Sequence, residues 1–232
     1  MSRNSVLRTT SLQAKALVVF FLLLLCVPAY AQDSGAGKQE ILERSRLTRE
    51  IANMESPTRK IWQEPDRIIE TLGVKGGDVV ADVGAGTGYF TFRLARKVGE
   101  TGKVYAVDRE QEYLDYIGKK MEKNGVKNII PVLSTNRDPR LPASCCSILL
   151  LVNVYGHLLH PIEFMKSARK ALKPVGRVVI IDSRMRKFKD TSPLKPNLMT
   201  SREDVIIQME SMGYKLVKEY DYLQQQYFLV FE

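Results

Sequence analysis

Cysteine and histidine are scarce in this chain of 232 residues, which holds three cysteines and two histidines. Cys145 and Cys146 are adjacent and could bridge each other only through a strained ring, while Cys26 lies in an apolar N-terminal segment. We therefore expect no disulfide framework. The Cys and His spacings typical of metal sites are also missing, so we expect no bound metal.

Acidic side chains are absent from residues 1–31, whose only charges are Arg3, Arg8 and Lys15. An unbroken apolar run covers residues 16–27, shorter than the roughly 20 residues that cross a bilayer, and Ala29 and Ala31 are the small residues that a signal peptidase reads. The pattern predicts a signal peptide over residues 1–31 and a secreted or periplasmic protein. The alternative is an uncleaved membrane anchor formed by residues 16–27.

A large charge of one sign is also missing. The 35 basic and 26 acidic side chains give a net charge of +9, which falls to +6 if the signal segment is removed. This balance and the few aromatic residues argue against a nucleic-acid partner, and membrane contact is expected only through the signal segment. The remaining length suits one α/β domain over residues 59–232, preceded by a leader and helix over residues 32–58.

Apolar runs without polar alternation recur through that domain and predict strands that are covered on both faces, as in a parallel sheet. The expected strands span residues 79–83, 104–107, 129–133, 147–152 and 177–181. Helices are expected over residues 89–98, 111–123 and 161–174. A further helix, opened by the capping-box spacing of Thr200 and Glu203, precedes a terminal hairpin of residues 214–220 and 226–231.

The most informative stretch is a glycine loop, where Gly84, Gly86 and Gly88 follow the first buried strand and precede a helix. Glycine there lets backbone N–H groups approach a ligand closely. Asp108 ends the next strand 20 residues after Gly88, the offset expected for a carboxylate that accepts hydrogen bonds from ribose hydroxyls. Together they predict a cofactor that contains adenosine.

Two residues around the loop argue against a nicotinamide dinucleotide, and hence against an oxidoreductase. Tyr89 stands where close packing of helix and strand needs a small residue, and Asp82 would face a pyrophosphate. An acidic residue at this position instead favours a ligand that has a cationic amino-acid end and no phosphate. That description fits S-adenosylmethionine.

Further landmarks support this interpretation, and with them the chain resembles the class I S-adenosylmethionine-dependent methyltransferases over roughly residues 59–232. They are Trp62, Gln63, Glu64 and Pro65 before the first strand, Leu141 and Pro142 before the fourth, residues 152–155 after it, and residues 172–177 before the fifth. The resemblance implies a Rossmann-like three-layer sandwich with a seven-stranded, mostly parallel sheet and a C-terminal antiparallel hairpin. Ser147 and Val175 depart from the pattern, in positions away from the glycine loop.

The resemblance also implies cofactor-binding positions. It assigns the methionine part to the glycine loop, the ribose to Asp108, the neighbourhood of adenine to Asn136 and the transferred methyl to Asn153. The full expected set is Asp82, Gly84, Ala85, Gly86, Thr87, Gly88, Asp108, Arg109, Asn136 and Asn153. Plainer roles stay open, because Asp82 could cap the following turn and Asp108 could be a helix N-cap.

No catalytic residue is identified. Tyr155 and His157 are weak candidates for a base, and each could equally be a packed or solvent-facing side chain. A basic cluster that follows the fifth strand predicts an anionic small molecule or lipid headgroup as acceptor, unless it is simply solvated: Arg184, Arg186, Lys187 and Lys189. We therefore expect a methyltransferase acting on a small-molecule or lipid acceptor. The alternative is an exported, non-catalytic binding module that retains the fold.

Overall fold

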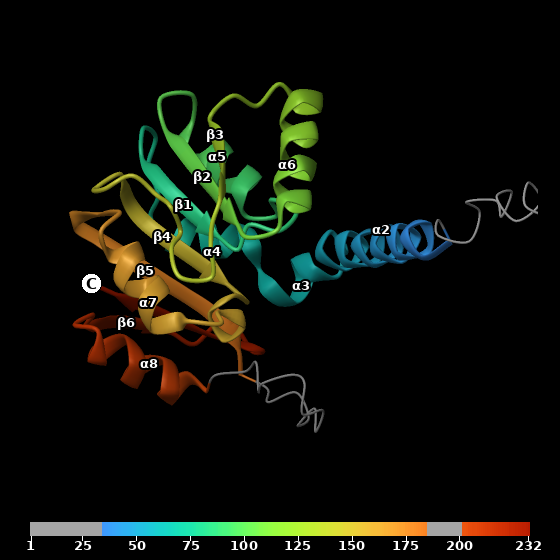
Figure 1. Cartoon of the computed structure of the whole chain (residues 1–232). Coiled ribbons are helices and arrows are strands. Elements are labelled where there is room, and N and C mark those ends of the chain that lie inside the picture. Colours follow the sequence, from blue (N-terminus) through green and yellow to red (C-terminus); the bar gives the residue numbers. More distant parts are fainter. Residues whose placement is uncertain (1–33, 185–200) are drawn as a thin grey trace, which may run out of the picture. The chain divides into compact units, whose positions relative to one another are not determined.

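The computed structural model describes residues 34–184 and 201–232 (Figure 1). The chain divides into two compact units, Met1–Glu50 and Ile51–Glu232, which are described separately here. The predicted signal peptide lies outside the described residues, as do Arg186, Lys187 and Lys189 of the predicted basic cluster and the predicted cap residue Thr200.

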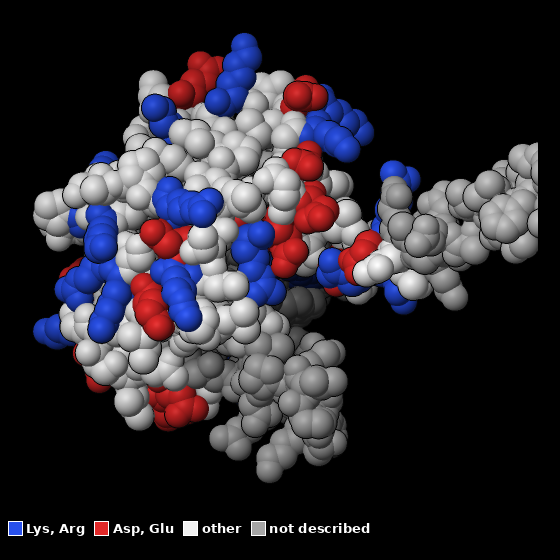
Figure 2. All heavy atoms as spheres, in the orientation of Figure 1, with Lys and Arg blue, Asp and Glu red and all other residues white. Residues whose placement is uncertain are grey.

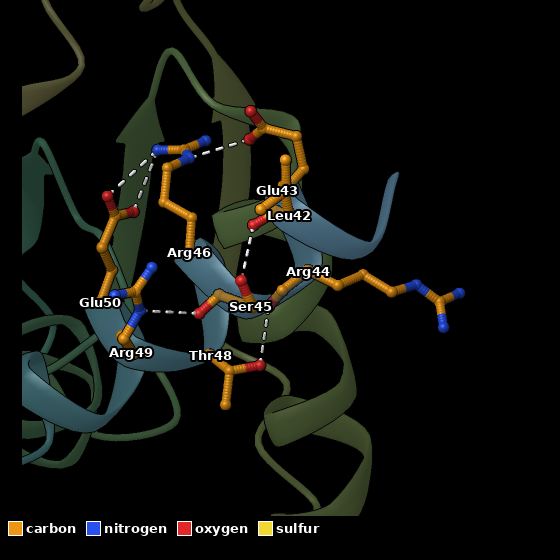
Figure 3. A network of polar contacts seen from close by, with 8 residues as sticks. All are labelled: Leu42, Glu43, Arg44, Ser45, Arg46, Thr48, Arg49 and Glu50. Carbon is orange, nitrogen blue, oxygen red and sulfur yellow. Dashed lines mark hydrogen bonds and ion pairs between the residues drawn. The ribbon is translucent and has the colours of Figure 1, made fainter. Parts of the chain in front are cut away.

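Residues 34–50 of helix α2 (Ser34–Met54) are the described part of the first unit, and residues 51–54 of the same helix belong to the second. The Gly- and Ser-rich composition of residues 32–38 predicts a flexible leader, with the helix starting at Gln39. In the structure the helix already begins at Ser34, and no proline interrupts residues 34–38. On its exposed surface Arg46 binds Glu43 one turn before it and Glu50 one turn after it, with N–O distances of 2.8 and 3.1 Å (Figure 3). Such solvated pairs add little to stability and favour the helix only locally.

The second unit is built on one seven-stranded sheet in the order β3-β2-β1-β4-β5-β7-β6. Strands β1 to β5 pair in parallel, whereas β7 runs antiparallel to both β5 and β6. This confirms the predicted sheet and its terminal hairpin. The strands are β1 (Val79–Val83), β2 (Lys103–Asp108), β3 (Ile129–Leu133), β4 (Cys146–Val152), β5 (Leu172–Ser183), β6 (Leu216–Tyr220) and β7 (Gln226–Phe231).

Helices cover both faces of the sheet, giving the three-layer sandwich in Figure 1. One face packs against α4 (Pro65–Thr71), α5 (Thr91–Val98) and α6 (Gln111–Asn124), and the other against α7 (Pro161–Arg169) and α8 (Arg202–Ser211). Strand β4 explains why apolar and polar residues do not alternate in its sequence. Ile148 and Leu150 pack into the first core cluster, whereas Leu149 and Leu151 pack into the second, so both sets are apolar.

The end of α7 and the cap of α8 differ from the prediction, and one helix was not predicted. Helix α7 ends at Arg169 rather than near Pro174, because Leu172 already pairs with Cys146 at the start of β5. The cap of α8 is Ser201, whose hydroxyl accepts a hydrogen bond from the Asp204 N–H at 3.1 Å. A short helix, α3 (Arg59–Gln63), was not anticipated.

The described helices include none with the length and apolar character needed to cross a membrane. Basic and acidic side chains are interspersed over the face of the molecule drawn in Figure 2. One of the ion pairs joins Arg67 to Glu64 at 2.9 Å. Cys145 and Cys146 are free thiols with their sulfurs 3.1 Å apart.

Candidate functional site

The predicted site residues meet at the carboxyl ends of the central strands. Strand β1 lies between β2 and β4, with Val83 level with Val107 on one side and with Leu151 on the other. The chain therefore leaves β1 for the glycine loop beside the ends of both neighbours. The strand order reverses at this point, and ligands of open α/β sheets bind in the crevice formed there.

The glycine loop adopts left-handed backbone conformations, which glycine reaches without the steric cost that other residues have. Gly84, Gly86 and Gly88 all have positive φ, at 72°, 51° and 77°. A Cβ on Gly84 would overlap the side chain of Val154, and one on Gly86 would lie 3.0 Å from the sulfur of Met54. The loop thus needs glycine both for its conformation and for its close neighbours.

Asp108 ties the end of β2 to this loop. Its carboxylate accepts hydrogen bonds from the Gly86 N–H at 2.8 Å and the Glu110 N–H at 3.1 Å. Burial raises the pKa of Asp108, while these backbone donors favour the charged form. Glu110 itself is the N-cap residue of α6, so Asp108 bonds just outside the helix and does not act as its N-cap.

Asp82 lies one residue before the end of β1 and is buried. Its carboxylate accepts a hydrogen bond from the Thr91 hydroxyl at 2.6 Å and another from the Thr91 backbone N–H. Thr91 is the first residue of α5, so Asp82 holds the start of that helix, as the plainer interpretation expects. Loss of solvation raises the pKa of Asp82 to about 6.

Replacing Asp82 by asparagine should stabilise the fold at neutral pH. Because the folded-state pKa is raised above the unfolded value, the stability that Asp82 contributes is full below about pH 4 and is lost as the pH rises through about 6. Asp82→Asn should therefore exceed wild type by about 2–3 kcal/mol at pH 7 and converge with it near pH 4. Urea unfolding at several pH values measures this.

The matched control for that experiment is Asp115→Asn, which changes an exposed carboxylate on α6. It should follow wild type at every pH. An Asp82→Asn protein whose stability runs parallel to wild type from pH 4 to pH 7 would contradict the assignment of a raised pKa to this carboxyl.

The predicted adenine neighbourhood forms a shallow cavity of about 340 Å³ next to Asp108. It is lined by Arg109, Glu110, Ser134, Thr135 and Asn136. Arg109 is half exposed and forms an ion pair with Glu110 at 3.2 Å. The structure thus brings Asn136 to the same side of the site as Arg109.

Asn153 follows β4 with a left-handed φ of 57°, and its partly buried side chain joins a relay with the buried amides of Gln226 and Gln63. Its carbonyl accepts a hydrogen bond from Gln226 at 2.7 Å, and the Gln226 carbonyl accepts one from Gln63 at 3.2 Å. Arg59 in turn donates to the Gln63 carbonyl at 2.6 Å. Gln63 was visible in the sequence only as a landmark, and no sequence signal pointed to Gln226, 163 residues away.

The two weak candidates for a base occupy different environments. Tyr155 is buried, donates a hydrogen bond to Gln208 at 3.1 Å and has its pKa raised to about 12 by burial, which makes it a poor proton acceptor near neutral pH. His157 is exposed at the end of the short helix η2 (Tyr155–His157). Asp182, which the sequence did not single out, accepts a hydrogen bond from the Gly156 N–H, and burial raises its pKa.

Two buried hydroxyls at the loop have no partner among the described residues, namely those of Thr87 and Tyr89. Buried polar groups are nearly always hydrogen-bonded, so these two hydroxyls beside the glycine loop are groups that a polar ligand would satisfy. With Asp82 and Asp108 on either side of the loop, the site fits a ligand that carries both ribose hydroxyls and a charged amino-acid end.

Comparisons with known proteins agree with this geometry. A family model described as a methyltransferase domain matches residues 74–226. A crystal structure of an S-adenosylmethionine-dependent methyltransferase from Aquifex aeolicus superposes with a TM-score of 0.71 and 26% identity, covering 81% of this chain and 96% of that one.

Two curated relatives match over shorter shares of their own length. A chloroplastic 2-phytyl-1,4-beta-naphthoquinone methyltransferase of Arabidopsis thaliana is 28% identical over 71% of this chain and 62% of that protein. A protein-L-isoaspartate O-methyltransferase of Aeropyrum pernix is 37% identical over 33% of this chain and 29% of that protein. The chain thus spans less than two thirds of the length of either relative. The family model and the superposed crystal structure show that it belongs to the class I S-adenosylmethionine-dependent methyltransferase family.

Proposed function

We propose that this protein transfers a methyl group from S-adenosylmethionine to a small-molecule acceptor. The observation that carries the proposal is that the glycine loop contacts Asp108 directly, through the hydrogen bond from the Gly86 N–H to the Asp108 carboxylate. That bond leaves acceptor capacity on both carboxylate oxygens for ribose hydroxyls. The family's donor supplies an electrophilic methyl on a sulfonium.

The chain's own residues have distinct roles in this proposal. Asp108 orients the ribose, the loop backbone approaches the methionine part, and Asn136 borders the adenine. Asn153, held by Gln226, lies next to the transferred methyl and helps to fix the acceptor. The rate then derives from positioning and from replacement of water around the sulfonium by fixed dipoles, so an acidic acceptor needs no base.

For the acceptor we favour a lipophilic or anionic small molecule. The relative that matches over the larger share of this chain is named for a naphthoquinone with a phytyl chain. Arg184, the described member of the basic cluster, is anchored at the end of β5 because its side chain donates a hydrogen bond to the backbone carbonyl of Gln226 at 2.8 Å. It therefore lies next to the residue that holds Asn153, where a cation would attract an anionic acceptor.

Methyl transfer can be tested without knowing the acceptor. Purified protein is offered S-adenosylmethionine labelled in the methyl group together with fractionated cell extract, and labelled products and S-adenosylhomocysteine are measured. We expect both to appear together in one fraction and neither with Asp108→Ala. Saturable cofactor binding with no S-adenosylhomocysteine released from any fraction would instead favour the non-catalytic binding module.

We further propose that the protein is exported, on the basis of the cations, apolar run and small residues of residues 1–31. N-terminal sequencing of protein from fractionated cells should find Gln32 first. An intact N-terminus in the membrane fraction would favour the anchor of residues 16–27, and one in the cytoplasmic fraction would overturn export.

A further inference from the structure

Cys145 and Cys146 form a pair of thiols at the amino end of β4, which the proposed function does not use. Their sulfurs lie 3.1 Å apart, with Cys145 partly exposed and Cys146 fully buried. Cys146 is the first residue of β4, whereas Asn153 follows the last one. The seven residues of this strand, roughly 20 Å in length, therefore separate the thiols from the crevice at the carboxyl ends of the strands.

The backbone on both sides of Cys145 is fixed by hydrogen bonds to the segment that leads into β5. The Ser144 N–H donates to the Lys170 carbonyl and the Cys146 N–H donates to the Ala171 carbonyl, each at 2.9 Å. Cys146 lies within the second core cluster, and Cys145 packs against it. The fold thus holds the two sulfurs side by side, and a ligand that takes both gains from this preorganisation.

A direct bond between the two sulfurs fits this position poorly. Adjacent Cα atoms are about 3.8 Å apart, whereas disulfides usually join Cα atoms about 4.4–6.8 Å apart. The sulfurs would also have to move from 3.1 Å to about 2.05 Å. The pair is therefore a dithiol, whose sulfurs are joined with less distortion by a single bridging atom.

The sulfur separation selects among thiophilic atoms. An atom bonded to both sulfurs at about 2.3 Å, the length of a zinc–thiolate bond, spans 3.1 Å at an angle of about 85°. A linear two-coordinate ion would hold the sulfurs about 4.6 Å apart. A tetrahedral metal site needs more ligands, and no cluster of three or more His, Cys, Asp or Glu suited to a metal occurs in the described parts of the chain. Trivalent arsenic carrying one organic group is pyramidal, with bond angles close to a right angle, and needs only two sulfurs.

We propose that Cys145 and Cys146 bind organic trivalent arsenicals, at the opposite end of β4 from the methyl-transfer site. An arsenoxide, R–As=O, forms two As–S bonds as the two S–H bonds break. The oxygen and the two protons leave as one water, and the arsenic stays trivalent.

The two thiols have different parts in this reaction. Cys145 is the accessible thiol and forms the first As–S bond. Burial raises the pKa of the Cys146 thiol, which keeps it protonated and unreactive towards dissolved reagents. Arsenic already attached to its neighbour reaches Cys146 within the same molecule, so the second bond closes the chelate.

Phenylarsine oxide is the probe for this site. Reduced full-length protein is loaded with one equivalent and titrated with 2-mercaptoethanol, and the arsenic that stays on the chain after gel filtration is measured. We expect one arsenic per wild-type chain, removed readily by 2,3-dimercaptopropanol. Cys145→Ser and Cys146→Ser should each lose the arsenic at a monothiol concentration at least about 100-fold lower, because one As–S bond lacks the chelate's effective concentration.

Cys26→Ser is the matched control, because it removes the remaining cysteine and leaves the pair intact. It should hold arsenic as wild type does. Circular dichroism establishes that each variant is folded. Cys145→Ser changes the partly exposed thiol, so it provides the comparison even if the buried substitution Cys146→Ser prevents folding.

Arsenic that wild type releases as readily as Cys145→Ser would overturn the proposal, as would a reduced wild-type protein that takes up none. Bound arsenical should change the affinity for S-adenosylmethionine by no more than about twofold, as expected for distant sites. A larger loss would contradict the separation of the two sites. The arsenic count does not depend on cofactor binding, so this proposal and the proposed function fail independently.

Discussion

Asp108→Ala should weaken binding of S-adenosylhomocysteine at least about 100-fold. The substitution removes a carboxylate placed to accept two ribose hydrogen bonds, and bonds to a charged group contribute about 1.5–3 kcal/mol each. It also leaves the Gly86 and Glu110 N–H groups without their present acceptor, so the loop itself loses its link to β2. Equilibrium dialysis with labelled ligand measures the affinity.

Asp108→Asn is the matched variant for this experiment. Its side chain keeps one oxygen and the same shape, so it should retain either the loop contact or part of the ribose contact and lose only about tenfold in affinity. Circular dichroism establishes that each variant is folded. Folded Asp108→Ala protein with wild-type affinity would show that this carboxylate serves only to join the loop to β2.

Gly84→Ala should lower the free energy of unfolding by about 2–4 kcal/mol. The left-handed conformation of Gly84 costs an L-residue about 1–2 kcal/mol, and the new methyl would overlap the side chain of Val154, which adds overpacking. Since the loop must shift to relieve the overlap, cofactor affinity should fall as well. Urea denaturation gives the stability of each variant.

Two further variants identify the cause of that loss. Gly118→Ala changes a glycine inside α6 whose added Cβ would meet nothing within 4 Å, so it should stabilise by up to about 1 kcal/mol. Val154→Ala combined with Gly84→Ala should lose less stability than the two single losses added together, because it removes the clashing methyl groups. Strict additivity would show that Val154 is not the obstacle.

The strands were predictable because burial on both faces leaves a strong sequence signal. Strands β1, β3 and β7 have the predicted bounds, and β4 differs by one residue. The junction of α7 and β5 was not predictable, since the pairing of Leu172 with Cys146 decides it and no local pattern encodes that pairing. The departures Ser147 and Val175 prove peripheral: Ser147 bonds the Val79 carbonyl, and Val175 is 91% exposed.

The sequence also predicted that the glycine loop and Asp108 share one site, because in this topology the ends of the first two strands are separated by a regular number of residues. It could not place Arg59, Gln63 and Gln226 there. Their relay depends on α3 meeting the first residue of β7, and a hydrogen bond between two glutamines far apart in the chain leaves no periodic pattern. The roles of the individual site residues remain predictions.

The central claim is that the folded protein binds S-adenosylmethionine at the glycine loop. Calorimetric titration of wild-type protein with S-adenosylmethionine measures this directly. The geometry predicts saturable binding with one site per chain, which Asp108→Ala weakens at least about 100-fold. Folded wild-type protein that takes up no S-adenosylmethionine would contradict the account.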